Sequence, residues 1–332
     1  MIYVDGSLGE GGGQVLRTAV ALSAVTGEPV KVSKIRAGRD NPGLRPQHLK
    51  AVEGVGLLCG ARLEGLAVGS TEVTFAPGRI MGGGLIVDVG TAGSATLVLQ
   101  ALLPVALSAP ADVDLTVLGG TDVSHSPTAD YFRGVFLGNL KSIGCEVETE
   151  VIRRGFYPKG GGEIKVMVKP WKRRRIGFAE RGAVDSIRLL SIATEHLRRQ
   201  EVAERQAKGF LKTVSPLNRV DAVERAYAES ESIGSAVTAA ASCGGTSIGA
   251  CVLGERGLKA EMVGRMAGER LLAELAHGAA VDSHMADQMI PYLAIAGGEV
   301  RAPPLTEHAK TCMEVAGKFG YDIVYRNGLL TA

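Results

Sequence analysis

The chain has 332 residues, of which 45% are hydrophobic and 22% charged, a balance typical of a soluble globular protein. A formal net charge of +2 argues against a whole-protein field that attracts a polyanion, and five scattered cysteines without a C-x-x-C pair argue against a zinc site or a disulfide framework. The start of the chain lacks the pattern of a secretory signal, and the apolar run 97–107 is too short to cross a bilayer. We therefore expect a cytoplasmic protein without a membrane span.

The first candidate phosphate site is a glycine-rich segment, residues 5–17, which we predict to be a strand end, a loop and a helix start. Backbone N–H groups at such a helix start bind phosphate, and Glu10 offers the carboxylate oxygens that hard divalent cations prefer. The segment is neither a Walker A motif nor G-x-G-x-x-G, because Gln14 fills the last glycine position. A tight turn that merely packs two elements together is the alternative.

A second candidate is the loop 35–48, which carries Arg36, Arg39 and Arg45 and ends at Gln47 and His48. Arginine guanidinium groups match phosphate oxygens in pairs. The proline and glycine residues of the loop favour a fixed shape, which suits a binding site. A solvated charged loop is the alternative.

A pattern of helix, glycine and strand occurs three times, in the segments 47–63, 130–147 and 307–324, and each helix is followed by a glycine suited to a helix C-terminus. An earlier helix, opened by a polar or glycine-rich turn, precedes each segment near residues 11–20, 90–100 and 283–290. We therefore predict an α+β fold built from three repeated βαβαβ-type modules, each a sheet with helices on one face.

The spacing of the repeats predicts an inserted domain. Gly144 lies 84 residues after Gly60, whereas Gly320 lies 176 residues after Gly144, and the excess of 92 residues is the size of a small domain. We expect residues 1–179 and 276–332 to form one large catalytic domain and residues 180–275 to form a small α/β domain. Within the insert we predict helices at 200–214 and 261–275 and strands at 184–192, 222–230 and 249–253.

Three further polar segments have weaker functional signals. The loops 120–130 and 153–163, each considered alone, are expected to be ordinary surface turns. The basic run 172–175, just before the insert, is expected to be a solvated linker, with RNA contact as the alternative.

Near the C-terminus, a single histidine is the strongest candidate for catalysis. Pro303 and Pro304 precede Thr306, a typical helix cap, so His308 is expected in the first turn of a helix. The positive end of the helix dipole disfavours imidazolium and favours a nearby anion. A neutral histidine that faces a phosphate is suited to phosphoryl or nucleotidyl transfer, whereas a histidine on a helix surface is the alternative.

Taken together, these segments resemble the RNA 3′-terminal phosphate cyclase family over nearly the whole chain. The resemblance rests on short motifs that include Gly-Glu-Gly-Gly-Gly-Gln at 9–14, Ile-Arg-Ala-Gly-Arg at 35–39, Gly-Ser-Ala-Thr at 93–96, Gly-Gly-Thr-Asp at 119–122, Gly-Phe-Tyr-Pro at 155–158, Ala-Asp-Gln at 286–288 and Thr-Glu-His at 306–308. The family architecture, repeated α+β modules with a smaller inserted domain, agrees with the spacing described above.

The resemblance implies a three-step reaction with ATP and an RNA 3′-phosphate end as substrates. His308 would attack the α-phosphate of ATP to form a covalent histidine–AMP and release pyrophosphate. The AMP would pass to the 3′-phosphate of the RNA. The neighbouring 2′-hydroxyl would then form a 2′,3′-cyclic phosphate and release AMP.

The resemblance also implies roles for the candidate residues. Glu10 would hold a divalent metal, Mg²⁺ or Mn²⁺. Residues expected to bind phosphates or RNA are Arg17, Arg36, Arg39, Gln47 and His48. Residues expected to bind ATP are Gln100, Pro127, His284, Asp287 and Gln288, with Pro127 and His284 on either side of the adenine. The family often has a tyrosine where this chain has His284, and a histidine ring offers less stacking area.

Two other kinds of protein compete with this interpretation. Relatives that act as non-catalytic RNA-binding factors in ribosome assembly share the fold but lack the nucleophilic histidine. An enolpyruvyl transferase of similar modular architecture would need neither a covalent histidine nor an adenine pocket. The presence of both His308 and Glu10 favours the enzyme over the assembly factor.

Overall fold

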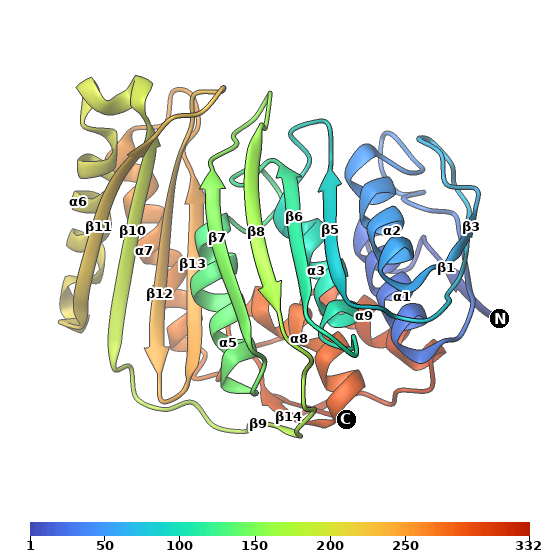
Figure 1. The fold of residues 1–332 in the computed structure, drawn as a ribbon. Helices are drawn as coiled ribbons and strands as arrows, with labels where there is room; N and C mark the ends of the chain where they lie inside the picture. Colours follow the sequence, from blue (N-terminus) through green and yellow to red (C-terminus); the bar gives the residue numbers. More distant parts are fainter.

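The computed structural model describes all 332 residues and contains four four-stranded sheets with helices packed on them (Figure 1). Helices and strands are therefore mixed along the chain, which confirms the predicted α+β class. None of the helices combines the length and the apolar composition that a membrane span requires.

The N-terminal sheet has the strand order β1-β2-β4-β3. Strands β1 and β2 are parallel because helix α1 connects them, and β4 runs antiparallel to both β2 and β3. The elements of this unit are β1 (Ile2–Asp5), α1 (Gly13–Thr26), β2 (Val30–Ser33), α2 (Pro46–Cys59), β3 (Arg62–Glu64) and β4 (Val73–Ala76).

The central sheet, β5-β6-β8-β7, repeats this order and these directions. Its second helix is continuous but contains a π-helical turn between α4 and α5. The elements are β5 (Gly83–Asp88), α3 (Ala95–Ala106), β6 (Val113–Gly119), α4 (Ala129–Tyr131), the π-helical turn (Phe132–Phe136), α5 (Leu137–Ser142), β7 (Val147–Arg153) and β8 (Gly162–Val168).

The third sheet, β15-β16-β14-β9, pairs strands that lie far apart in the sequence. Strand β9 runs parallel to β14 although more than a hundred residues separate them, so the chain leaves this sheet after β9 and returns to it. The elements are β9 (Ile176–Phe178), α8 (Ser283–Ala296), β14 (Gly298–Arg301), α9 (Glu307–Lys318), β15 (Val324–Arg326) and β16 (Leu329–Thr331). Each of these three units has one strand more than the predicted βαβαβ pattern, because an antiparallel hairpin ends it.

The fourth sheet, β11-β10-β12-β13, is formed by the segment between β9 and α8, and helices α6 and α7 pack on it (Figure 1). The two predicted helices of this segment are present within two residues of their expected ends. Strand β12 was missed, because it is rich in alanine, has Val237 and Thr238 as its only β-branched residues, and lacks the alternating pattern that identifies strands. The elements are β10 (Ser186–Thr194), a 3₁₀ segment (Glu195–Gln200), α6 (Val202–Val214), a second 3₁₀ segment (Ser215–Leu217), β11 (Val220–Ala228), β12 (Ser235–Cys243), β13 (Thr246–Leu253) and α7 (Ala260–Ala276).

Two separate hydrophobic clusters form the interior. One contains 66 buried residues from the first three sheets and their helices. The other contains 16 buried residues, all between Ile187 and Leu275, and fills the space between the fourth sheet and its two helices.

Candidate active site

Helix α9 begins as the sequence predicts, and it places His308 in its first turn. The Oγ1 atom of Thr306 accepts a hydrogen bond from the backbone N–H of Ala309 at 3.0 Å, which caps the helix. The imidazole is 41% exposed, and its Nε2 atom lies 3.7 Å from Oε2 of Glu10 in the N-terminal glycine loop. Two segments almost three hundred residues apart therefore meet at this histidine.

The surroundings of His308 favour the neutral form of its imidazole. Partial burial lowers the pKa of His308, and the nearby charges of Arg17, Arg39 and His284 lower it further, whereas Glu10 opposes the shift. The lone pair of a neutral imidazole is available for attack. The charge that repels an extra proton is also the charge that attracts a phosphate.

Gln14 holds the helix of His308 against helix α1. Its Nε2 atom donates to Sγ of Cys312 at 2.9 Å and, over a longer 3.5 Å, to the carbonyl oxygen of His308. The hydroxyl of Thr18, one turn further along α1, lies 3.2 Å from the same sulfur atom. Sequence reasoning did not assign this role to Gln14. The signal available was a polar residue in the position that a glycine occupies in G-x-G-x-x-G.

Glu10 lies at the surface of the glycine loop, where its carboxylate contacts both His308 and Arg39. Besides its contact with His308, its Oε2 atom lies 3.4 Å from the guanidinium of Arg39. No group of three or more histidine, cysteine, aspartate or glutamate side chains is close enough to enclose a metal ion. Such a site fits a cation held by one carboxylate together with substrate phosphates, as Mg²⁺ commonly is, rather than a cage made by protein alone.

His48 is a buried neutral histidine that packs against the start of α1. It is 5% exposed. Burial lowers its pKa to about 3, with further lowering by Arg17, Arg36 and Arg45. The backbone N–H of Arg45 donates to Nδ1 at 3.4 Å, so the proton of the neutral ring lies on Nε2. That atom faces Gly13 so closely that a β-carbon at residue 13 would overlap the ring.

Arg36 and Gln47 partly serve to fix the loops that carry them. The guanidinium of Arg36 donates to the carbonyl oxygens of Asn41 and Gly43 at 2.5 and 3.0 Å, which gives the arginine loop a defined shape. The side-chain oxygen of Gln47 accepts from the backbone N–H of Ser94 at 2.9 Å and so holds the start of α3 beside the start of α2.

The predicted ATP-binding residues of α3 and α8 include buried polar atoms without partners. Nε2 of Gln100 and Oε1 of Gln288 are both buried and form no hydrogen bond in the protein, and their helices pack against each other. An unpaired buried polar atom costs about 1–3 kcal/mol, so two of them on facing helices are the signature expected of a ligand site. Tyr292, deeper in α8, carries the remaining unpaired buried hydroxyl.

The other two predicted residues of α8 differ in exposure. His284 is exposed, and Asp287 is buried. Burial raises the pKa of Asp287 well above its usual range, with a further increase from Asp282, while Arg17 opposes the shift. Arg17 thus acts electrostatically on both His308 and Asp287, and it connects His308 with the predicted ATP-binding helix.

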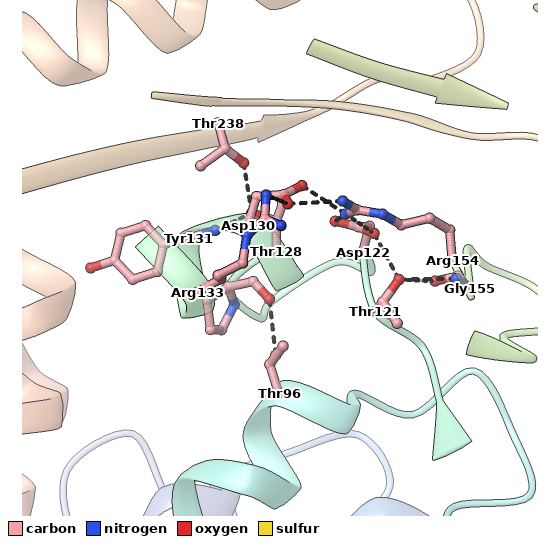
Figure 2. A network of polar contacts seen from close by, with 11 residues as sticks. Thr96, Thr121, Asp122, Thr128, Asp130, Tyr131, Arg133, Arg154, Gly155 and Thr238 are labelled. Atoms are coloured by element: carbon pink, nitrogen blue, oxygen red, sulfur yellow. Dashed lines mark hydrogen bonds and ion pairs between the residues drawn. The ribbon is translucent and has the colours of Figure 1, made fainter. Parts of the chain in front are cut away.

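The loop that contains Pro127 is fixed at both ends. Oγ1 of Thr96 donates to the carbonyl oxygen of Pro127 at 2.9 Å, and the hydroxyl of Thr128 caps the following helix through the N–H of Tyr131 (Figure 2). The same hydroxyl lies 2.7 Å from that of Thr238 on β12. Pro127 therefore lies between helix α3 and the fourth sheet.

The loops 120–130 and 153–163 are not the ordinary surface turns that we expected, because a buried ion cluster joins them. The guanidinium of Arg154 is 9% exposed and contacts Asp130 at 2.7 and 2.8 Å and Asp122 at 3.2 Å (Figure 2). The carbonyl of Gly155 accepts from the backbone N–H groups of Thr121 and Asp122 at 2.8 and 3.1 Å. This pairing could not be predicted from either loop alone, because opposite charges in two separate segments of the sequence do not show that the segments are in contact.

Comparison with known proteins identifies the family of this chain. A family model described as RNA 3′-terminal phosphate cyclase matches residues 8–322. A protein of Pyrococcus furiosus named RNA 3′-terminal phosphate cyclase is 46% identical over 320 residues, which cover 96% of this chain and 93% of that protein. Proteins of the same name from Methanopyrus kandleri and Archaeoglobus fulgidus are 45% and 43% identical over 309 and 321 residues, covering 90% and 96% of this chain and 87% and 95% of theirs.

The chain therefore belongs to the RNA 3′-terminal phosphate cyclase family. The match spans the N-terminal glycine loop, the arginine loop and helix α9, the three segments that the fold brings together around His308.

Proposed function

We propose that this protein converts the 3′-terminal phosphate of RNA into a 2′,3′-cyclic phosphate at the expense of ATP. Family membership supports the reaction, and the observation that carries it is the environment of His308. A neutral imidazole at a helix start, next to a carboxylate and two arginines, is suited to attack a bound phosphate.

In the first step, Nε2 of His308 attacks the α-phosphorus of ATP, the bond to the β-phosphate oxygen breaks, and pyrophosphate leaves. In the second, an oxygen of the RNA 3′-phosphate attacks the same phosphorus and the phosphorus–nitrogen bond breaks. In the third, the 2′-hydroxyl of the terminal ribose attacks the RNA phosphorus and AMP leaves. Adenylylation thus replaces a poor leaving group by a good one.

The arginines and the ATP-binding residues have separate roles in this scheme. Arg17 and Arg39, which act on His308 electrostatically, neutralise phosphates beside it, while Arg36, Gln47 and His48 shape and line the adjoining loops. Residues proposed to surround the nucleoside are Gln100, Pro127, His284, Asp287 and Gln288. The unpaired amide atoms of Gln100 and Gln288 support a ligand between α3 and α8.

Glu10 is proposed to hold a divalent cation, Mg²⁺ or Mn²⁺, together with phosphate oxygens of ATP. When bound, the cation supplies charge neutralisation and orientation of the triphosphate. Glu10 also faces His308, and its negative charge raises the pKa of the imidazole.

We propose further that residues 1–179 and 276–332 form a large domain of three related modules and that residues 180–275 are an inserted domain. The shared strand order of three sheets supports related modules. The separate hydrophobic cluster between Ile187 and Leu275 supports an insert with its own core.

Labelling with ATP tests the proposed function. The protein is incubated with α-labelled ATP and Mg²⁺ or Mn²⁺, denatured, and examined for retained label. We expect label that is lost in acid, as a phosphorus–nitrogen bond is, and that mass spectrometry locates on His308. Label on another side chain would refute the mechanism, and the absence of label under every condition would favour the non-catalytic assembly factor.

A further inference from the structure

We propose that the turn between β7 and β8 is a binding site for the RNA strand, where Tyr157 stacks on a base upstream of the two terminal nucleotides. This inference rests on the proposed function, since it extends the substrate site. Figure 1 shows the turn at the same end of the central sheet as the C-terminal ends of β5 and β6. We call residues 153–162 the β7–β8 turn.

Tyr157 is a large aromatic side chain that does not pack in the interior of the protein. It is 74% exposed, whereas its neighbour Phe156 is 3% exposed. The ring of Phe156 packs so tightly against Gly234 that a β-carbon at residue 234 would overlap it. The turn therefore directs one aromatic ring inward as an anchor and presents the next one to solvent.

The backbone on both sides of Tyr157 is held in place. On one side, the buried guanidinium of Arg154 pairs with two carboxylates, as Figure 2 shows. On the other side, the N–H of Lys159 donates to the hydroxyl of Ser232 at 3.1 Å, and the N–H of Gly160 donates to the carbonyl of Phe156 at 2.8 Å. A ring on a fixed backbone loses little entropy when a base stacks on it, so the position is preorganised for binding.

Close packing connects the β7–β8 turn to the active site. A β-carbon at Gly160 would lie 2.8 Å from Cα of Ala92, so the turn touches the loop that precedes α3. The same loop contacts Gln47, since a β-carbon at Gly93 would lie 2.9 Å from its Cβ atom. Gln47 directly precedes His48, which packs on the start of α1, next to His308. These contacts link the turn to the segments around His308, and the proposed path of the RNA strand follows them from His308 to the turn.

The chemistry of the turn suits a single strand of nucleic acid. Aromatic rings bind bases of any sequence by stacking, and cations beside them bind the phosphates. Arg153 and Lys159 lie on either side of Tyr157 in the sequence, and neither is among the residues that form ion pairs in the protein. The side chain of Arg153 donates to the carbonyl of Gly161, which fixes its direction. Glu231 is the carboxylate that packs against the turn, and its charge opposes a phosphate.

The length of the RNA provides the test. Wild type, Tyr157→Ala and Tyr157→Phe are compared on 3′-phosphorylated oligonucleotides of two to twelve nucleotides with saturating ATP. We expect Tyr157→Ala to raise KM on the order of tenfold for long substrates, from the usual strength of base stacking, and to leave KM for the dinucleotide unchanged. Tyr157→Phe keeps the ring and should match wild type. A matched control is Tyr3→Ala, since Tyr3 is 68% exposed on the first sheet.

Two further readouts separate the possible failures. Labelling of the enzyme by ATP alone reports on the first step without RNA, and fluorescence anisotropy of the same oligonucleotides reports on binding without catalysis. If wild type neither labels nor cyclises, the proposed function is wrong, and anisotropy still decides whether Tyr157 binds RNA. If wild type cyclises and Tyr157→Ala has the wild-type KM and affinity at every length, the stacking site is refuted.

Substitutions of the charged residues beside Tyr157 give an independent test, because removing a cation and removing an anion should change RNA binding in opposite directions. Lys159→Ala should weaken binding of the long oligonucleotide and reduce the slope of log affinity against log salt by about 0.7 for one lost phosphate contact. Glu231→Gln should strengthen binding or leave it unchanged. Weaker binding by Glu231→Gln, together with an unchanged salt slope for Lys159→Ala, would contradict a phosphate path along this turn.

Discussion

Replacing Arg154 with methionine tests how the loop 120–130, which contains the proposed ATP-binding residue Pro127, is positioned. The guanidinium makes its three short contacts to Asp122 and Asp130 while almost fully buried. Methionine keeps much of the volume but leaves Asp122 in the interior without a cation, and Asp130 with the half-exposed Arg133 as its remaining partner. Loss of one partner from a buried ion pair costs about 3–5 kcal/mol, so the free energy of unfolding should fall by that amount.

A neighbouring arginine provides a matched control. Arg133 contacts the same carboxylate, Oδ1 of Asp130, at 3.3 Å, but its side chain is 48% exposed. An exposed ion pair contributes about 0–1 kcal/mol, so Arg133→Met should be nearly neutral. Denaturant unfolding of the wild type and both variants measures the difference. Equal effects of the two substitutions would refute the argument from burial.

The pH dependence of the free energy of unfolding tests whether the unpaired buried carboxylate causes the loss of stability in Arg154→Met. Burial raises the pKa of Asp122, and Arg154 holds it down, so removing Arg154 raises that pKa further. The folded variant then binds a proton more tightly than its unfolded chain does, and acid stabilises it. The stability gap between wild type and Arg154→Met should therefore narrow as the pH falls from about 7.5 towards 5. A gap that stays constant would show that lost packing, and not the unpaired carboxylate, is responsible.

Four further predictions concern the active site itself. His308→Ala should abolish covalent labelling by ATP while changing the free energy of unfolding by less than about 1 kcal/mol, because the side chain is half exposed at a helix start; wild-type labelling would exclude its role. Because its pKa is lowered, the nucleophile should remain neutral and labelling should stay constant from pH 8 down to about 6.5, falling only below that; loss already between pH 8 and 7 would contradict the lowered pKa. Glu10→Ala should mainly raise the metal concentration needed for half-maximal labelling, and an unchanged metal titration would refute Glu10 as a ligand. Gly13→Ala should displace the buried ring of His48 at a cost of about 1–3 kcal/mol and slow labelling, whereas wild-type stability would show that the ring has room to move.

Local chemistry in the sequence was sufficient for much of the fold. Helix starts and ends depend on caps, glycines and the spacing of apolar residues, and these signals placed α2, α7 and α9 within one or two residues. Strand β12 was missed because alanines carry no strand signal, and its place between β10 and β13 depends on pairing with both. The additional hairpin strand in each of the first three sheets was missed for a similar reason, since short antiparallel strands are stabilised by their partners.

The sequence by itself determined which residue types are suited to bind phosphate and that His308 lies in the first turn of a helix, because both follow from side-chain chemistry and neighbours along the chain. Only the tertiary structure decided which of these groups meet. Glu10 contacts His308, and Arg154 pairs with two distant aspartates, although no local pattern relates these segments. The burial that lowers the pKa of His48 to about 3 likewise depends on segments that lie apart in the sequence. Such contacts depend on the packing of whole helices and sheets, where burial and distance set the strength of every charge.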